Sequence, residues 1–187
     1  VFQWYIQSSI QVSLALISLL SYSGKVLDIP ISHHYYMALF FGGIAAYNGI
    51  KYGLEPGKHS YSIPGGLQIL IPFSIACVVI ALYHLAYLPL YVWLLIIACG
   101  VLTAMYALPV LPGMRNLRSM GFLKVFMVAL VWALATVWIP VWDHPGMPAW
   151  DVQVEGLQRL LWVFLLMLPF EIRDMKVDPP AIRTIPQ

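Results

Sequence analysis

The sequence predicts an all-α protein, a bundle of six helices that cross a membrane. Three observations lead to this prediction. Of the 187 residues, 61% are hydrophobic and only 10% are charged, whereas about a quarter of the residues in a soluble domain are charged. The apolar residues are gathered in six segments whose lengths approach the roughly 20 residues that a helix needs to cross a bilayer. The basic residues are concentrated in alternate loops between these segments, as in membrane proteins.

The first half of the predicted bundle consists of residues 4–21, 35–51 and 67–85. The first segment begins with Trp4 and Tyr5, and such aromatic residues are typical of the membrane interface. The second segment is short for a complete span, so its ends are expected to run into the interface. It contains Gly42 and Gly43, which allow a neighbouring helix to approach closely. The third segment is long and carries no Asp, Glu, Lys or Arg residue.

The second half of the predicted bundle consists of residues 88–108, 123–141 and 157–170. The fourth segment is uncharged and has Tyr91 and Trp93 near its start, and the fifth has Trp138 near its end. These positions again indicate interfacial aromatic residues. The sixth segment is short, so its ends are also expected to lie in the interface.

The basic residues predict the orientation. Eight of the ten Lys and Arg residues follow the second, fourth and sixth segments, namely Lys51, Lys58, Arg115, Arg118, Lys124, Arg173, Lys176 and Arg183. By the positive-inside rule these loops and the N-terminus are cytoplasmic, and we expect an integral protein of the cell (inner) membrane. No predicted span carries an ionisable residue near its middle, which argues against a transporter. The net charge is only +2, so nothing suggests nucleic-acid binding.

The histidines do not predict a metal site. His33 and His34 are adjacent at the expected start of a helix, and adjacent helical residues do not face one point. His84 and His144 are expected to be isolated from other histidines and to lie at the interface. We therefore assign no metal ion to any histidine.

The chain ends in the charged run FEIRDMKVDPPAIRTIPQ. Glu171, Asp174 and Asp178 are spaced three and four residues apart, so they lie on one face if the helix continues through them. Three carboxylates on one face repel each other and need a counter-cation, and Mg²⁺ prefers such oxygen ligands. The alternative is an ordinary solvated cluster of charges at the membrane surface.

This run resembles the second acidic motif of the UbiA superfamily of intramembrane prenyltransferases. That motif reads as an acid, one residue, Lys or Arg, Asp, three residues, Asp, and then a short stretch that ends in Thr-Leu-Pro. The residues that match it in type and order are Glu171, Arg173, Asp174, Asp178 and Thr184-Ile185-Pro186. The family carries this motif in the cytoplasmic loop after the sixth of nine helices.

The resemblance implies a site for Mg²⁺ and a diphosphate at the cytoplasmic mouth of a membrane cavity. Asp174 and Asp178, helped by Glu171, would hold the metal that assists catalysis, and Arg173 would contact the diphosphate. The resemblance also implies that residues 1–187 form one transmembrane domain, the N-terminal two-thirds of a UbiA-like domain. Three further helices of the nine-helix plan would then lie outside this chain.

The first acidic motif of the family, expected after the second helix, is eroded. The sequence there is AAYNGIKYGLE, and Asn48, Lys51 and Glu55 stand at the acidic positions when the pattern is shifted by one residue. Only Glu55 is an acid and could help to hold the metal. Either Lys51 replaces a metal ion and contacts the diphosphate directly, or the site no longer ionises a prenyl diphosphate. A third interpretation is that Asn48 and Lys51 simply cap the helix and snorkel at its end.

The loop between the fourth and fifth segments, MYALPVLPGMRNLRSMGFLKVF, holds the other candidates for diphosphate binding. The resembling enzymes place a Tyr and basic residues here, which implies roles for Tyr106, Arg118 and Lys124, with Arg115 a weaker candidate. Arginine suits phosphate oxygens because it can donate two hydrogen bonds at once. The alternative is that these cations only set the topology.

The function that the resemblance implies is transfer of an isoprenyl group from a prenyl diphosphate to an unknown lipophilic acceptor, assisted by Mg²⁺, in the lipid bilayer. The alternative is a degenerate relative that binds an isoprenoid or another lipid, or acts as a scaffold. The eroded first motif supports this alternative.

Overall fold

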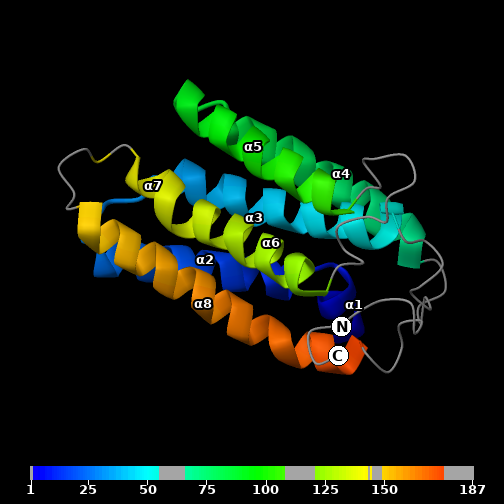
Figure 1. Ribbon diagram of the computed structural model, residues 1–187. Coiled ribbons are helices and arrows are strands. Elements are labelled where there is room, and N and C mark those ends of the chain that lie inside the picture. Colours follow the sequence, from blue (N-terminus) through cyan, green and yellow to red (C-terminus); the bar gives the residue numbers. More distant parts are fainter. Residues whose placement is uncertain (1, 55–65, 108–120, 143, 145–148, 175–187) are drawn as a thin grey trace. The chain divides into compact units, whose positions relative to one another are not determined.

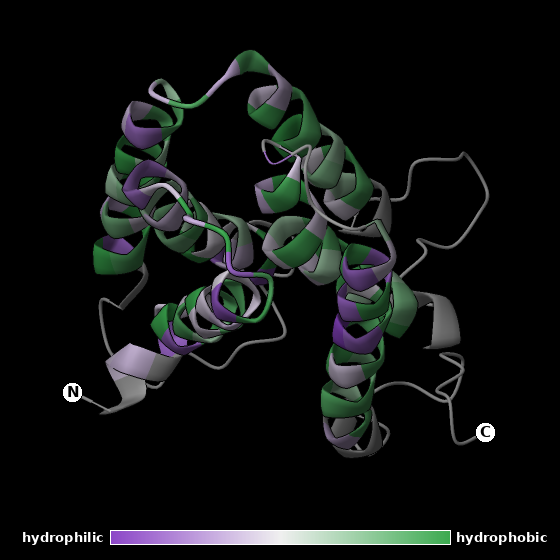
Figure 2. Ribbon diagram, turned by 90° about the vertical axis from the view of Figure 1, so that its left-hand side faces the viewer, coloured by the Kyte–Doolittle hydropathy of each residue, from purple (hydrophilic) through white to green (hydrophobic). Residues whose placement is uncertain are grey.

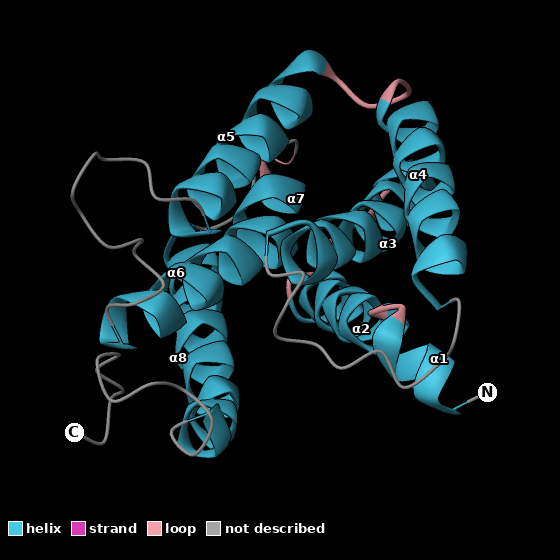
Figure 3. Cartoon of the chain, turned by 90° about the vertical axis from the view of Figure 1, so that its right-hand side faces the viewer, coloured by secondary structure: helices cyan, strands magenta, loops and turns pink. Residues whose placement is uncertain are grey.

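The computed structural model describes residues 2–54, 66–107, 121–142, 144 and 149–174. Within these ranges all regular structure is helical (Figure 3), and the helices form six segments along the chain. The all-α prediction is therefore confirmed. The chain divides into two compact units, residues 1–93 and 94–187, which are described separately.

The first unit is built around one central helix. Its elements are α1 (Phe2–Gln7), α2 (Ile10–Val26), α3 (His33–Asn48), the π-helix η1 (Gly49–Leu54) and α4 (Gly66–Leu85). Helix α3 contacts both α2 and α4 (Figure 1). The Ser32 side chain caps α3 by accepting a hydrogen bond from the backbone N–H of His34, at 3.2 Å, as serine commonly does at helix starts.

The expectation of one continuous helix over residues 4–21 is wrong. The helix is interrupted at Ser8 and Ser9, and Ser9 has a left-handed backbone with φ of 59°. The hydroxyl of Ser8 donates a hydrogen bond to the carbonyl of Tyr5, at 3.2 Å. Serine side chains offer the backbone such local alternatives to regular helical bonding. As a result, Gln7 and Gln11 lie on different helices, α1 and α2.

The close helix approach predicted at Gly42 and Gly43 is confirmed at Gly43. A Cβ atom on Gly43 would lie 2.7 Å from Oγ of Ser13 and 3.1 Å from Cδ1 of Leu16. Both of these residues belong to α2 and are buried. The glycine therefore lets the backbone of α3 lie against α2 at a distance that a larger residue would prevent.

The second unit contains one interrupted helix packed against one long helix. The interrupted helix consists of α6 (Gly121–Ala133), the π-helix η3 (Leu134–Trp138) and α7 (Ile139–Val141), and α8 (Ala149–Asp174) contacts both α6 and η3. Val125, Ala129 and Ala133 are fully buried, and their spacing of four residues forms a stripe along α6. Helix α5 (Leu90–Ala107) runs across the boundary between the units.

Helix α8 is longer at both ends than the predicted residues 157–170. It begins at Ala149, with Asp151 in its first turn, where a negative charge interacts favourably with the helix dipole. Within this longer helix, Glu155 lies before the predicted segment and is paired with Arg159 inside it. The Arg159 guanidinium forms an ion pair with the Glu155 carboxylate at 2.6 Å and donates a hydrogen bond to Oγ1 of Thr136 in η3 at 2.9 Å.

This network corrects the expectation that no span carries an ionisable residue near its middle. The apolar stretch Ala149–Pro169 has 21 residues, and Arg159 is the eleventh of them. The side chains of Arg159 and Glu155 are only 2% and 5% exposed. Two charges are tolerated inside an apolar helix when they are paired and hydrogen-bonded to a neighbouring element.

Two helices are long and apolar enough to cross a membrane. The stretches are Gln68–Leu85 in α4 and Ala149–Pro169 in α8, and only 17% and 28% of their residues are buried in the protein. Apolar residues are seen along the length of the helices in Figure 2. Most residues of these two stretches are therefore not buried by the part of the chain that the structure describes.

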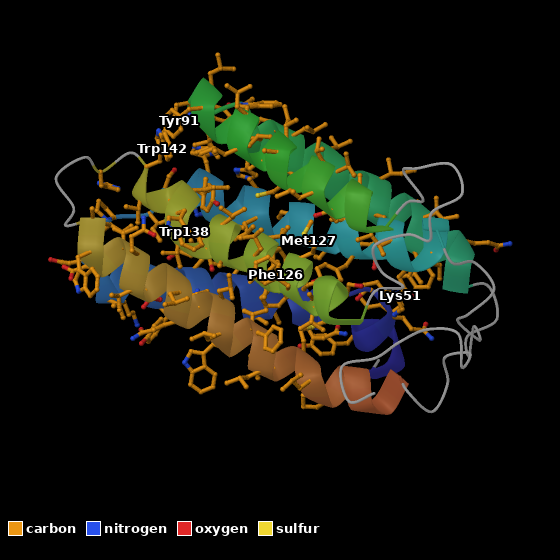
Figure 4. The ribbon with its side chains drawn as sticks, viewed as in Figure 1. Lys51, Tyr91, Phe126, Met127, Trp138 and Trp142 are labelled. Carbon is orange, nitrogen blue, oxygen red and sulfur yellow. The ribbon has the colours of Figure 1, made fainter. Side chains whose placement is uncertain are left out.

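The contact between Gly156 and Trp138 predicts a large effect of a single methyl group. A Cβ on Gly156 would overlap the ring of Trp138 (labelled in Figure 4), so Gly156→Ala must displace a rigid side chain. We expect a loss of about 1–3 kcal/mol in the free energy of unfolding, measured in detergent by thermal or denaturant unfolding. Gly100→Ala is the matched control, because a Cβ on Gly100 meets no atom within 4 Å. An equal loss in both variants would contradict this packing.

The buried ion pair predicts non-additive mutational effects. Glu155→Leu alone leaves the Arg159 guanidinium buried without its carboxylate, and we expect it to cost about 3–5 kcal/mol. The double variant Glu155→Leu/Arg159→Leu removes both charges and should be more stable than the single variant. A double-mutant cycle measured by unfolding tests this. Additive losses would show that the two side chains do not interact.

Candidate functional site

A cluster of polar side chains lies where α3 becomes the π-helix η1. Asn48 is the last residue of α3, and Lys51 and Tyr52 belong to η1. A π-helical turn changes the angular spacing of side chains and is often found at functional sites. Asn48 and Lys51 occupy positions expected for the first acidic motif of the UbiA superfamily.

Asn48 is held by a hydrogen-bonded chain to α4. Its side chain is 2% exposed, and Nδ2 donates to Oγ of Ser74 at 2.9 Å, while the Ser74 hydroxyl donates to the carbonyl of Leu70 at 2.7 Å. The amide oxygen Oδ1 is buried and accepts no hydrogen bond from the residues that the structure describes. A buried acceptor without a donor costs about 1–3 kcal/mol.

Lys51 lies beside an aromatic ring. Its ammonium nitrogen is 5.1 Å from the centre of the Tyr52 ring, a distance at which a cation is attracted to the ring face. The Tyr52 hydroxyl donates to the backbone carbonyl of Gln7 in α1 at 2.8 Å. Lys51, labelled in Figure 4, is half-buried. In the described part of the chain no carboxylate pairs with it, so its positive charge can still attract an anion.

The acidic residues of the second motif begin on α8. The helix continues to Asp174, so the condition for a shared face is met for Glu171 and Asp174, which are three residues apart. Arg173 lies in the same last turn. For these three residues the structure describes the backbone and not the side chains. Asp178 lies outside the described residues.

The structure describes only some of the other residues predicted to bind the diphosphate or the metal. Tyr106 is near the end of α5 and Lys124 is in the first turn of α6, again with undescribed side chains. Glu55, Arg115 and Arg118 lie outside the described residues. Among the side chains that are described, no group of three or more His, Cys, Asp or Glu residues could hold a metal ion. The magnesium site stays a prediction, because its proposed ligands are not among those side chains.

The expectation that His84 is isolated is wrong. Its Nδ1 atom lies 3.1 Å from Nδ1 of His34, because the end of α4 lies beside the start of α3. Neither this contact nor the bond between Asn48 and Ser74 has a signal in the local sequence. Both follow from the antiparallel packing of α3 on α4, which brings together residues 50 and 26 positions apart.

Comparisons with known protein families, curated proteins and solved structures gave no match to this chain. The resemblance to the UbiA superfamily therefore depends on the residues of the second acidic motif and on the helix order.

The hydrogen bond between Asn48 and Ser74 predicts that Ser74→Ala is destabilising. The substitution leaves the buried Asn48 amide without its acceptor, and we expect a loss of about 1–3 kcal/mol in the free energy of unfolding. Ser18→Ala is the control, because the Ser18 hydroxyl bonds to its own helix at Leu14 on an exposed surface. Unfolding in detergent measures both. Equal stability of the two variants would contradict a structural role for the bond.

Proposed function

We propose that this chain is part of a membrane prenyltransferase of the UbiA type. The observation that carries the proposal is the order of acids and cations from Glu171 to Asp178, which begins on the last turn of a long apolar helix. The all-α fold and the helical backbone of Glu171 and Asp174 support it. The donor set also fits Mg²⁺, since carboxylate oxygens are the protein ligands that this ion prefers.

The proposed location is the cell (inner) membrane, with the N-terminus and the acidic motifs on the cytoplasmic side. The support is the exposed apolar surface of α4 and α8, of whose apolar stretches less than a third is buried. In water such a surface would favour aggregation, whereas in lipid it carries no penalty. The distribution of Lys and Arg residues supports the orientation.

In the proposed reaction the allylic C–O bond of a prenyl diphosphate breaks, and its electron pair leaves with the diphosphate. The prenyl group then forms a bond to the acceptor, which loses a proton. Bound Mg²⁺ would neutralise the negative charge that develops on the leaving diphosphate. Asp174 and Asp178, with Glu171 and Glu55, would hold the metal.

The cations would bind the remaining charge of the diphosphate. Lys51 is suited to this role because its ammonium group is half-buried and its ring partner Tyr52 is fixed by the bond to Gln7. One hydrogen of the Asn48 amide is used by Ser74, and an amide nitrogen has a second. Arg118, Lys124, Arg173 and Tyr106 are the further residues proposed to contact the diphosphate.

A specific observation favours a second candidate, a non-catalytic relative that binds an isoprenoid or lipid or acts as a scaffold. The two described residues of the first motif have partners within the chain, Asn48 with Ser74 and Lys51 with the Tyr52 ring. Neither is an acid. A site with one acidic face would bind a diphosphate more weakly through metal ions than a site with two.

A measurement of catalytic turnover distinguishes the prenyltransferase from the non-catalytic relative. The full-length protein in detergent is incubated with labelled farnesyl or geranylgeranyl diphosphate and Mg²⁺, with and without aromatic acceptors, and release of diphosphate is measured. We expect release to fall at least about 100-fold in Asp174→Ala and Asp178→Ala, because metal-assisted charge neutralisation contributes several kcal/mol. Lys51→Ala should also reduce release.

Two control variants make this test specific. Asp151→Ala removes an exposed acid from the other end of α8, and Lys25→Ala removes an exposed cation near the end of α2. Both should retain full release. Tight binding of the prenyl diphosphate without turnover, unchanged by a chelator, would contradict the enzyme and support the second candidate.

A further inference from the structure

The break between α1 and α2 leaves the carbonyl of Gln7 open to a side chain from another helix. Helix α1 ends at Gln7, and the last carbonyl groups of a helix have no donor within that helix. Ser9 has a left-handed backbone, so α2 starts as a new helix. The Gln7 carbonyl accepts a hydrogen bond from the Tyr52 hydroxyl, at 2.8 Å. The break at the serines thus creates the acceptor that holds Tyr52.

Helix α1 is itself held beside Asn48. The Trp4 ring packs against the Phe73 ring of α4, with ring centres 5.3 Å apart and planes inclined by 58°. Phe73 precedes Ser74, whose hydroxyl accepts the hydrogen bond from Asn48. Helix α1 has only 6 residues, and so short a helix needs tertiary contacts to be stable. Its contacts with α4 and η1 supply them, and they fix the Gln7 carbonyl in place.

The fixed ring of Tyr52 restricts the position of the Lys51 ammonium group. Nζ of Lys51 lies 5.1 Å from the ring centre, a distance at which a ring attracts a cation. Both residues lie in the π-helix η1, whose wider turn brings adjacent side chains closer in angle than an α-helix does. A lysine has a flexible four-carbon stem. Holding that stem before a ligand arrives reduces the conformational entropy that binding would remove.

An aromatic partner leaves the lysine charge available to an anion. The ring attracts the ammonium group through its quadrupole and carries no net charge. A carboxylate partner would accept the N–H groups of the lysine and compete with a phosphate for them. Among the described residues no carboxylate pairs with Lys51. Its ammonium group is half-buried, where an anion is attracted more strongly than in bulk water.

We infer that Tyr52 is a positioning residue, which holds the Lys51 ammonium group where it binds the diphosphate of a prenyl diphosphate. The ring acts on Lys51 directly, and the hydrogen bond to the Gln7 carbonyl fixes the ring. Helix α1 therefore takes part in substrate binding without touching the substrate. This inference rests on the proposed prenyl transfer, in which Lys51 contacts the diphosphate.

The test measures the affinity of the full-length protein in detergent for labelled farnesyl diphosphate, at fixed Mg²⁺ and without an acceptor. Tyr52→Phe keeps the ring and loses the bond to Gln7, whereas Tyr52→Leu loses the ring as well. We expect the affinity to fall in that order, by about three- to tenfold in Tyr52→Leu, the size of a partly desolvated cation–π contact. Tyr22→Leu is the control, because Tyr22 is a 55% exposed tyrosine of α2, and it should bind as the wild type does.

A double-mutant cycle separates positioning from a merely structural role. In the Lys51→Ala background Tyr52→Leu should have no further effect on affinity, because the ring then has no ammonium group to hold. An equal loss in both backgrounds would overturn the inference, and so would wild-type affinity in Tyr52→Phe or Tyr52→Leu. Thermal unfolding shows which variants are folded, and Tyr52→Phe carries the same cycle if Tyr52→Leu does not fold.

The wild type and Lys51→Ala show whether the proposed function or only this inference has failed. Binding by the wild type that weakens in Lys51→Ala supports the diphosphate site, and the Tyr52 variants then decide the positioning role alone. Absence of binding by the wild type, or undiminished binding in Lys51→Ala, would overturn the diphosphate role of Lys51 and this inference with it.

Discussion

The structure depends on one constraint, that polar groups on apolar helices must find partners within the protein. An unpaired polar group in an apolar environment costs several kcal/mol, so each such group fixes how two elements pack. Asn48 joins α3 to α4 through Ser74, and Arg159 joins α8 to η3 through Thr136. These bonds are directional, whereas apolar surfaces alone would allow helices to slide and rotate against one another.

The same constraint separates structural from functional polar residues. The charges of Glu155 and Arg159 satisfy each other in the middle of an apolar stretch, so this pair needs no ligand. Buried polar atoms without a hydrogen-bond partner among the described residues include Oγ of Ser13 within α2 and Oδ1 of Asn48 at the end of α3. The Asn48 oxygen accepts no bond from the described residues, and Lys51 faces a ring rather than an acid. Ligand binding is therefore proposed at the Lys51 end of α3.

Apolar runs predicted the helical regions because burial in lipid or protein selects them directly. They could not predict the break at Ser8 and Ser9, which depends on local serine bonding, or the start of α8 at Ala149, because the residues before Leu157 include the charged Asp151 and Glu155. For the site, the spacing of Glu171 and Asp174 indicated a shared face on the condition that the helix continues beyond residue 170, and the helix does continue to Asp174. Spacing could not predict that Ser74 holds Asn48 or that His84 meets His34, because both contacts are made between different helices. Gly43 did predict a contact between two helices, because a glycine on an apolar helix allows a neighbouring helix to pack closely.

The central claim is that the exposed apolar faces of α4 and α8 are in contact with lipid. The most direct measurement places spin labels at Val79 and Leu165, which are 61% and 56% exposed, in a variant without Cys77 and Cys99, reconstituted in bilayers. If these faces contact lipid, dissolved oxygen will relax both labels more strongly than a water-soluble nickel chelate does, while a label at the exposed Asp28 will show the reverse. Stronger relaxation by the nickel chelate at Val79 and Leu165 would place these faces in water and contradict the account.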